Sequence, residues 1–406
     1  MSTASQRRLG HCASAAVEHP PLVSRSQGVL PAVHLCAALA EHARTVRINR
    51  VIAVLDPGGA QLSMLRLARA QSVLGVETRL LAGDATPQGI ALARHYGFEA
   101  DVFSMHDEIG HSARQWTPDN AFADWLADRM DHIDLVHAHL FGAWWAAARS
   151  TPRHVPVIAS EHDRLTWPLG DHSVAAAAAA ARIDRFFVHG QDGRAFGSGL
   201  GVEPPRVLNG RSAISQHTTA RPGLVSPRLT FTGRLREDKG PDLLLHALAE
   251  MRDPPVTYIV GDGPMSQQLR RHIDRLGLRR TVQLTGWSFE PARYVAGATV
   301  HVVPSRRDSW SQSAVTGFAL GVPVVATTVD GLPTTLAERR GLLVRPEPAA
   351  LAAGIQSVLD GTAAIDREAG RRYALAFQPA EIASDYFAVY QHVLAGWAAR
   401  ASGAAV

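Results

Sequence analysis

Short apolar runs alternate with longer amphipathic stretches along most of this chain. Residues 50–55, Arg-Val-Ile-Ala-Val-Leu, predict a buried strand that ends in the glycine-rich turn at 56–59. In residues 61–74 apolar side chains recur at helical spacing, and residues 77–82 predict a second strand. A strand, a glycine turn, a helix and a further strand, in this order, indicate an α/β domain of the doubly wound type.

The alternation continues along the chain with one interruption. Residues 211–228 are polar, carry Pro222, Gly223 and Pro227, and predict a linker. Further strands are predicted at residues 135–139, 157–160, 186–188 and 207–208 before the linker, and at 229–231, 256–260, 282–284, 299–303, 324–326 and 341–344 after it. Further helices are predicted at residues 116–130, 175–183, 242–251, 265–276, 348–359 and 379–397. The pattern therefore predicts two α/β domains of similar architecture.

Composition places the chain among ordinary globular proteins. Its 406 residues, 46% of them hydrophobic and 19% charged, suit two or three domains. We find neither a signal peptide nor an apolar run near the roughly 20 residues of a membrane span. Cys12 and Cys36 fall in residues 1–47, which we expect to be a partly disordered extension, and reduced thiols in a cytoplasmic protein are expected. The net charge of +4 comes from scattered arginines, so we expect no nucleic acid as partner and at most peripheral membrane contact.

Residues 303–327 join two predicted strands and are the most informative segment. Pro304 ends the first strand because proline has no amide hydrogen to donate, and Ser311 is an N-cap residue type before a helical pattern. Gly321 is suited to end that helix. Parallel sheets bind ligands beyond the carboxyl ends of their strands, so the loop around Asp308 is predicted to carry a site.

The segment 233–240, Gly-Arg-Leu-Arg-Glu-Asp-Lys-Gly, follows a predicted strand and precedes a predicted helix. Backbone amides at the start of a helix, together with Arg234 and Lys239, predict an anion site that can reach both phosphates of a diphosphate. Lys239 is the only lysine in the sequence, which suggests that this position requires a compact ammonium group. A solvated basic turn is the alternative.

Three other strand ends carry weaker signals. Gly58 and Gly59 follow the first strand, where glycine allows the backbone to approach a ligand closely. Gly261 and Gly263 form a similar turn, of a kind common in α/β proteins. Trp287 follows the strand at 282–284, and it either covers a base or caps the core.

His137 and His139 alternate at the end of one predicted strand. We expect their side chains to point to opposite sides, with one of them facing the site. Residues 161–163, Glu-His-Asp, form a second polar cluster at the next strand end. No carboxylate or cysteine set at metal-ligand spacing accompanies the His-x-His pair, so a metal is not expected.

With these motifs the chain resembles the retaining family-4 glycosyltransferases of the GT-B fold, over roughly residues 48–400. In that family a Gly-Arg-Leu-x-x-x-Lys-Gly segment supplies the arginine and lysine that hold the donor diphosphate, and these positions fall on Arg234 and Lys239. The second histidine of the family's His-x-His falls on His139. The glycine loop after the first strand is similar to Gly58-Gly59.

The resemblance also covers two turns and the last helix. The family's Gly-Asp-Gly-Pro turn matches residues 261–264, and its Asn-Gly before the linker matches residues 209–210. The resemblance implies two Rossmann-like doubly wound domains facing across a cleft. The implied division is a donor-binding domain and an acceptor domain with flanking segments, at 1–47 (extension), 48–210 (acceptor domain), 211–228 (linker), 229–378 (donor domain) and 379–406 (a helix crossing back to the first domain).

The chain departs from the family pattern at two acidic positions. The family carries Pro-Ser-x-x-Glu, with a second glutamate eight residues after the first, and these places hold Asp308 and Thr316. Asp308 keeps the charge that contacts sugar hydroxyls. Thr316 replaces the glutamate whose carboxylate binds the ribose, which would weaken donor binding by about 1–3 kcal/mol. Ser311, Gln312 and Ser313 can partly substitute.

The resemblance implies a metal-independent, retaining glycosyltransferase that needs no cofactor beyond an activated sugar donor. Arg234 and Lys239 would neutralise the leaving diphosphate, Asp308 would orient the sugar, and His139 would contact the sugar or the reacting centre. Gly233, Gly261, Gly263, Trp287, Ser311 and Thr316 would complete the donor site. The acceptor, a small molecule or a glycan, is not predicted. Arginine in place of lysine and abundant alanine are associated with GC-rich bacterial genomes, where such enzymes often build secondary metabolites or envelope glycans.

Two alternatives remain open. Thr316 also suits a donor without a nucleoside, such as phosphoribosyl pyrophosphate. Replacement of both family glutamates also suits a protein that kept the fold for binding a ligand or partner and lost its activity.

Overall fold

The computed structural model describes residues 45–402, apart from 109–113, 115, 163–169 and 191–192. The expectations for residues 1–44 of the N-terminal extension, Cys12, Cys36 and Asp163 lie outside the described residues. The last two residues of the predicted extension, 46–47, instead belong to the first strand.

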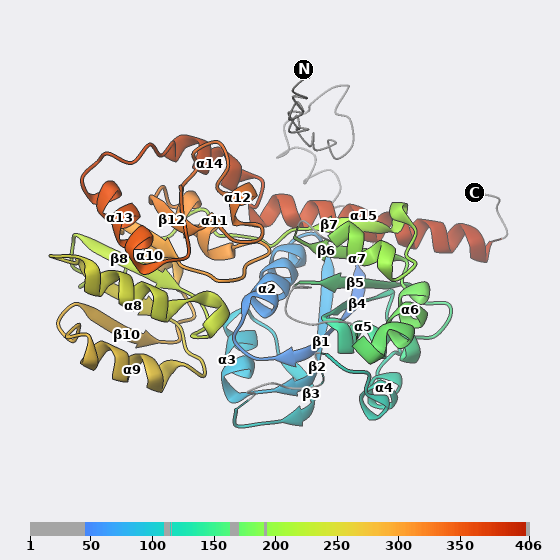
Figure 1. The fold of residues 1–406 in the computed structure, drawn as a ribbon. Coiled ribbons are helices and arrows are strands. Elements are labelled where there is room, and N and C mark those ends of the chain that lie inside the picture. Colours follow the sequence, from blue (N-terminus) through green and yellow to red (C-terminus); the bar gives the residue numbers. More distant parts are fainter. Residues whose placement is uncertain (1–44, 109–113, 115, 163–169, 191–192, 403–406) are drawn as a thin grey trace, which may run out of the picture. The chain divides into compact units, whose positions relative to one another are not determined.

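The first domain is built on a parallel sheet with the described strand order β3-β2-β1-β4-β5-β6-β7 (Figure 1). Its strands are β1 (Val46–Leu55), β2 (Val76–Ala85), β3 (Ala100–Met105), β4 (Leu135–His139), β5 (Val157–Glu161), β6 (Arg185–His189) and β7 (Val207–Gly210). Its helices are α2 (Gly59–Ser72), α3 (Pro87–His95), α4 (Asn120–Ala127), α5 (Phe141–Ser150), α6 (Ser173–Arg182) and α7 (Gly193–Gly199). The strand order reverses between β1 and β4, which makes the carboxyl ends of these two strands the expected ligand edge.

The second domain repeats this plan with the described strand order β10-β9-β8-β11-β12-β13. Its strands are β8 (Arg228–Thr232), β9 (Val256–Val260), β10 (Val282–Gly286), β11 (Val300–Val303), β12 (Val324–Thr327) and β13 (Leu342–Val344). Its helices are α8 (Pro241–Glu250), α9 (Ser266–Arg275), α10 (Ala292–Val295), α11 (Gln312–Ala319), α12 (Leu332–Thr335), α13 (Pro348–Leu359) and α14 (Arg367–Leu375). Here the order reverses between β8 and β11. The prediction of two doubly wound α/β domains is confirmed.

The local signals in residues 303–327 have the expected structural basis. Ser311 accepts a hydrogen bond from the Ala314 amide at 3.2 Å and so caps α11. Gly321 has a φ of +67°, which is the left-handed conformation that ends a helix. The strand, loop, helix and strand of this segment therefore follow from the capping chemistry of its own residues.

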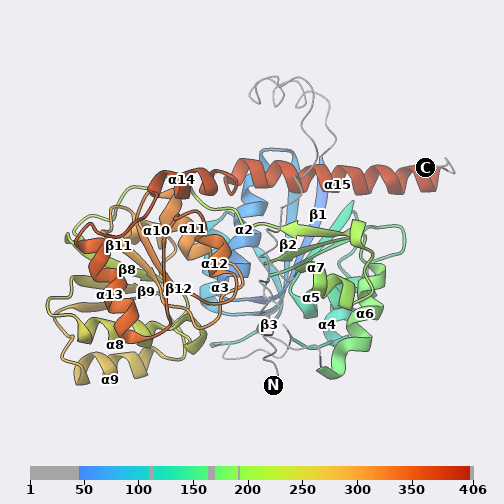
Figure 2. The same cartoon turned by 45° about the horizontal axis from the view of Figure 1, so that its top comes forward.

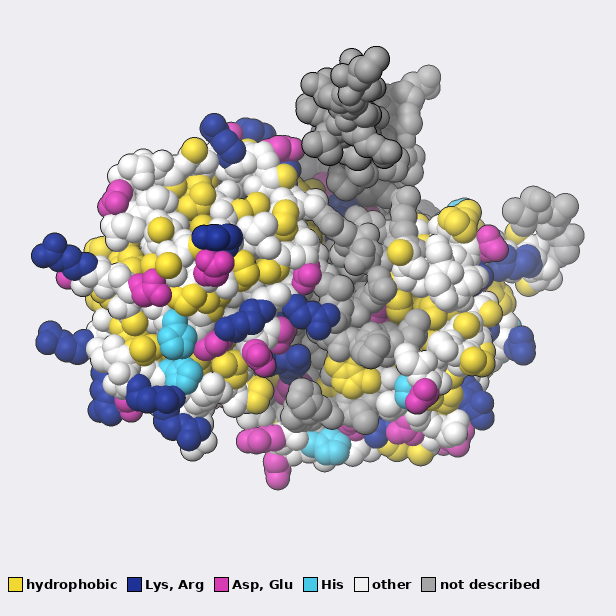
Figure 3. Space-filling view, viewed as in Figure 1, with side chains coloured by type: hydrophobic (Ala, Val, Ile, Leu, Met, Phe, Trp, Pro, Cys, Tyr) yellow, Lys and Arg dark blue, Asp and Glu magenta, His cyan; other side chains and the backbone are white. Residues whose placement is uncertain are grey.

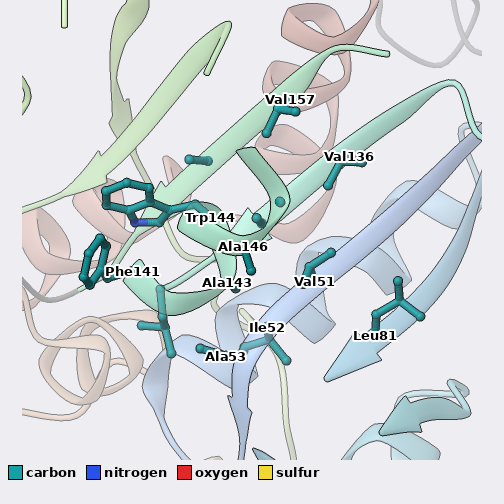
Figure 4. Packing of buried hydrophobic residues seen from close by; sticks show 14 of the residues in the cluster. Val51, Ile52, Ala53, Leu81, Val136, Phe141, Ala143, Trp144, Ala146 and Val157 are labelled. Atoms are coloured by element: carbon teal, nitrogen blue, oxygen red, sulfur yellow. The ribbon is translucent and has the colours of Figure 1, made fainter. Parts of the chain in front are cut away.

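The core of the first domain lies between its sheet and the surrounding helices, and Figure 4 shows the part of it against α5. Val51 and Ile52 of β1 are fully buried, as expected for a central parallel strand covered on both faces. Trp144 of α5 is also fully buried, and its indole N–H donates to a carboxylate oxygen of Glu161 at 3.1 Å. The largest side chain of this core therefore has its polar atom satisfied.

The long helix α15 (Pro379–Ala401) packs on the first domain although it follows the second in sequence (Figure 2). Ile382, Tyr386, Tyr390 and Val393 form one buried cluster with first-domain residues such as Ile48 of β1. Tyr386 stacks on Phe187 with ring centroids 3.9 Å apart. The apolar side of α15 is thus part of the first domain's packing.

On the face shown in Figure 3, basic and acidic side chains are interspersed over both domains. Within the described residues, no helix is both long and apolar enough to cross a membrane.

Acidification is expected to destabilise the second domain through His301 of β11. This fully buried side chain contacts Thr230 at 2.9 Å and Ser313 at 2.7 Å, and burial lowers its pKa from 6.5 to about 4. Because the unfolded chain takes up the proton first, stability is retained above pH 6.5 and falls as the pH drops toward 4, by about 2 kcal/mol at pH 5. Other buried histidines, such as His139 and His189, also lower the stability over the same range. Unfolding in guanidinium at pH 7 and pH 5 is therefore compared with that of a His301→Gln variant, which should show the shallower pH dependence. Equal slopes in both proteins would contradict the prediction.

Candidate active site

Four segments that carry predicted site residues lie at the two points where strand order reverses. Residues 56–59 follow β1 and His139 ends β4, while residues 233–240 follow β8 and Asp308 follows β11. Because the carboxyl ends of parallel strands share one edge, each domain presents two of these segments side by side.

Lys239 and Asp308 meet at the edge of the second domain. The Lys239 ammonium lies 3.3 Å from a carboxylate oxygen of Asp308, whose side chain is 8% exposed. The Asp330 carboxylate accepts a hydrogen bond from the Asp308 backbone amide at 2.9 Å and so holds the loop in place. The cation and the acid that were predicted from separate motifs are therefore direct neighbours.

Gly240 makes this approach possible. Its φ is +63°, and a β-carbon there would lie 2.0 Å from the Pro304 carbonyl oxygen. Glycine is required because the two loops pack backbone against backbone. Pro241 then begins α8, where the missing amide hydrogen costs nothing.

Arg234 reaches the first domain. Its guanidinium pairs with Asp56 and donates to the Pro57 carbonyl oxygen at 3.0 Å. The other oxygen of Asp56 accepts a hydrogen bond from Thr86 at 2.8 Å. A second contact to residues 56–59 comes from α11, where the Gln312 side-chain amide donates to the Gly59 carbonyl oxygen at 2.8 Å. Neither Asp56 nor its role was predicted, although it directly follows a buried strand, as the predicted site residues do.

Gly261 and Gly263 fit two strand-end turns together. A β-carbon at Gly261 would lie 1.9 Å from the Gly233 carbonyl oxygen, and one at Gly263 would lie 2.7 Å from the Leu235 carbonyl oxygen. These glycines are required for packing within the second domain, and their contact with a ligand remains a prediction. Trp287 lies against Phe289, with ring centroids 4.3 Å apart, and both pack on the first-domain core.

The hydroxyl groups near the lost glutamate are engaged within the protein. Thr316 donates to the Gln312 carbonyl oxygen one turn earlier, at 2.8 Å. Ser313 contacts Thr232 at 2.8 Å as well as His301, and Ser311 caps the helix. The structure therefore shows no carboxylate on α11, Gln312–Ala319, in place of the family's second acid.

The expectation that His137 and His139 point to opposite sides is wrong. Their rings lie on the same side of the sheet with centroids 4.2 Å apart, because side chains of a strand repeat with a period of two. His137 is fully buried and bonded to Tyr390 at 2.7 Å and Ser160 at 2.8 Å, which is a structural role. His139 bonds His162 at 3.0 Å through its Nδ1 atom.

His139 belongs to a row of histidines at the ends of β4, β5 and β6. His162 stacks on His189, the last residue of β6, with ring centroids 4.3 Å apart. Burial, and then the charges of neighbouring groups, lower the pKa of His139 and His162 well below the ordinary value, and burial lowers that of His189 to about 3. These imidazoles are therefore neutral at pH 7. His189 was not predicted, although its place at a strand end was the available signal.

Among the described residues, no group of three or more His, Cys, Asp or Glu side chains has the geometry of a metal site.

Comparison with known proteins identifies the family. The family described as "Glycosyltransferase Family 4" matches residues 57–207, and "Glycosyl transferases group 1" matches residues 226–361, so that the two together span both domains. The chain belongs to the family-4 glycosyltransferases.

The relatives of this glycosyltransferase include bacterial enzymes named D-inositol 3-phosphate glycosyltransferase. That of Streptomyces avermitilis is 28% identical over 385 residues, covering 79% of this chain and 80% of the relative. That of Jonesia denitrificans is 31% identical over 179 residues, which is 40% of this chain and 42% of the relative.

Solved structures establish the GT-B fold of the glycosyltransferase. Anabaena HepE, in complex with UDP and glucose, matches with a TM-score of 0.69 at 19% identity, over 86% of this chain and 100% of its own. Sucrose-phosphate synthase of Thermosynechococcus elongatus matches with a TM-score of 0.69 at 18% identity, over 87% and 100%. The predictions of fold, family and enzyme class are confirmed.

Proposed function

We propose that this glycosyltransferase transfers a sugar from a nucleoside-diphosphate donor to a small-molecule or glycan acceptor, without a metal and with retention of anomeric configuration. The observation that carries the proposal is the loop between β8 and α8. Its Lys239 pairs with Asp308 just before α8 begins, and its Arg234 reaches Asp56 of the first domain. Structural neighbours that bind UDP and UDP-glucose support a nucleotide-sugar as the donor.

The proposed reaction breaks the bond between the anomeric carbon and the leaving phosphate oxygen. Arg234, Lys239 and the amides at the start of α8 stabilise the charge that develops on the diphosphate. Asp308 accepts hydrogen bonds from the sugar, and His139 contacts the sugar from the first domain. The acceptor oxygen attacks the same face of the anomeric carbon, and its proton passes to the departing phosphate. Lys239 and Asp308 pair with each other, so neither is an isolated charge.

The names of the relatives suggest the acceptor class to test first. Several are glycosyltransferases of D-inositol 3-phosphate, so a phosphorylated polyol is the first candidate acceptor. A bacterial biosynthetic role in envelope glycans or secondary metabolites is consistent with these relatives.

The function is tested by calorimetry and by product analysis. UDP, GDP, ADP and phosphoribosyl pyrophosphate are titrated into the protein, and the corresponding activated sugars are incubated with inositol phosphates and simple glycans. Micromolar binding of one nucleoside diphosphate, with an α-linked product from an α-linked donor, is expected. Binding of phosphoribosyl pyrophosphate alone would replace the proposed donor. Binding without turnover across the acceptor panel would favour an inactive binding protein.

The Asp56→Asn variant is expected to bind the nucleoside diphosphate about three- to tenfold more tightly at low salt, because the Asp56 carboxylate competes with phosphate for Arg234. Calorimetry of both proteins at low and high ionic strength measures the difference, which should shrink with salt. Asp101→Asn is the control, because Asp101 of β3 pairs with Arg79 of β2 in the same kind of ion pair. Weaker binding by Asp56→Asn would instead make Asp56 an orienting partner of Arg234.

A further inference from the structure

The bond between His139 and His162 joins two imidazoles edge to edge. Nδ1 of His139 lies 3.0 Å from Nε2 of His162, the ring centroids are 5.3 Å apart, and the planes are inclined by 22°. This combination of a short nitrogen contact and a long centroid separation fits a hydrogen bond in the plane of the rings rather than a face-to-face stack. One of the two nitrogens must carry the hydrogen and the other must accept it.

His139 has no competing partner for this nitrogen in the described structure. His137, which lies over it, uses Nδ1 for Tyr390 and Nε2 for Ser160. His189 stacks on His162 and leaves the edge of that ring free for the bond. The tautomer of His139 is therefore coupled to that of His162 alone.

The direction of the bond follows from the chemistry of neutral imidazole. If His162 donates from Nε2, both rings hold the Nε2–H tautomer, which is the intrinsically favoured form of a neutral histidine side chain. If His139 donates from Nδ1, both rings must adopt the less favoured Nδ1–H form. Burial of His139 excludes the doubly protonated ring at neutral pH. The arrangement in which His162 donates is therefore favoured, because it places both rings in their preferred tautomer.

This arrangement leaves an N–H of His139 without a partner. His139 is 1% exposed, and its Nε2 atom is buried with no hydrogen-bond partner among the described residues. A buried donor of this kind is costly unless a ligand oxygen satisfies it. The donor sits at the carboxyl end of β4, beside the reversal of strand order.

We infer that His162 is a positioning residue, which donates to Nδ1 of His139 and holds it in the Nε2–H tautomer so that His139 offers a hydrogen bond to a hydroxyl oxygen of the bound sugar. This inference rests on the proposed sugar transfer. No proton changes hands, since a neutral donor serves throughout. His162 is itself held by a backbone hydrogen bond to the Glu161 carboxylate at 3.1 Å, and Glu161 also accepts the bond from Trp144. A series of hydrogen bonds thus connects buried Trp144 through Glu161 and His162 to His139.

The test reads the tautomer directly by nitrogen-15 NMR of the full chain labelled at its 19 histidines. The His139 signals are assigned by their disappearance in a His139→Gln variant. We expect Nε2 of His139 to be protonated in the unmodified protein. In His162→Phe, which keeps a ring against His189 but has no N–H, we expect His139 to exchange between its two tautomers and kcat/KM to fall about tenfold.

Two matched variants separate positioning from packing. In His162→Gln the amide nitrogen takes the place of Nε2, so the His139 tautomer and most of kcat/KM should be retained. His189→Phe alters the stack without touching the bond, and the His139 tautomer should be unchanged. Protonation of Nδ1 in unmodified His139, or a His162→Phe variant with unchanged tautomer and unchanged kcat/KM, would overturn the inference. Because the NMR measurement needs no substrate, a failure of the proposed sugar transfer would be seen separately, as absence of turnover in the unmodified protein.

Discussion

Replacing Arg234 or Lys239 by alanine is expected to lower kcat/KM for sugar transfer by about a hundred- to a thousandfold each, because each removes a cation that stabilises the leaving diphosphate in the transition state. Lys239 pairs with Asp308 in the second domain, whereas Arg234 pairs with Asp56 in the first. Initial rates with the donor identified by calorimetry measure the loss. Circular dichroism and thermal unfolding confirm that each variant is folded.

Arg236→Ala is the matched control for both substitutions. Arg236 lies on the same turn, but its guanidinium bonds Asp238 of that turn at 2.8 Å. Its removal should leave kcat/KM within about twofold of the unmodified enzyme, since this partly exposed ion pair joins two residues of the same turn and touches no predicted ligand group. Near-normal rates in both Arg234→Ala and Lys239→Ala would refute the assigned diphosphate site.

Truncation of Trp144 to alanine is expected to reduce the free energy of unfolding of the first domain by about 3–5 kcal/mol. The side chain is fully buried between the sheet and the rest of α5, and its loss leaves a cavity and removes a hydrogen bond to the buried Glu161 carboxylate. Denaturant unfolding monitored by circular dichroism gives the change.

The neighbouring residue supplies the comparison. Trp145 is of identical size but half-buried on the same helix, so Trp145→Ala should cost less than half as much. Equal losses for the two tryptophans would contradict the prediction, because they would show that burial of Trp144 adds nothing to the cost of removing a tryptophan from α5.

Much of the fold could be predicted because strongly apolar runs mark buried parallel strands. The strands at 135–139 and 256–260 were predicted with their observed bounds. Elements without such a signal were missed. Strand β3 is a half-exposed edge strand, and α5 begins after Leu140, whose φ of +71° replaces a conventional cap.

The candidate site was predictable where its residues lie in loops that directly follow a predicted strand. Lys239 and Asp308 were chosen from different motifs, and the structure brings them together. The pairing of Arg234 with Asp56 was not predictable, because local sequence does not encode which of many strand-end loops faces another across two domains. The misplacement of His137 had a different origin, since it ignored the period of two that places alternate residues of a strand on one face.

The position of α15 has a consequence for the order of events during synthesis. On the ribosome, β1 emerges early with Ile48 among the residues it must bury, but the partners of Ile48 in this cluster include Tyr386 and Tyr390. The whole second domain is translated in between, and it can close its own sheet first because α8 to α13 are local to it. The first domain is therefore synthesised first but completed last. Its apolar residues that pack against α15, such as Ile48, stay exposed until α15 has left the exit tunnel.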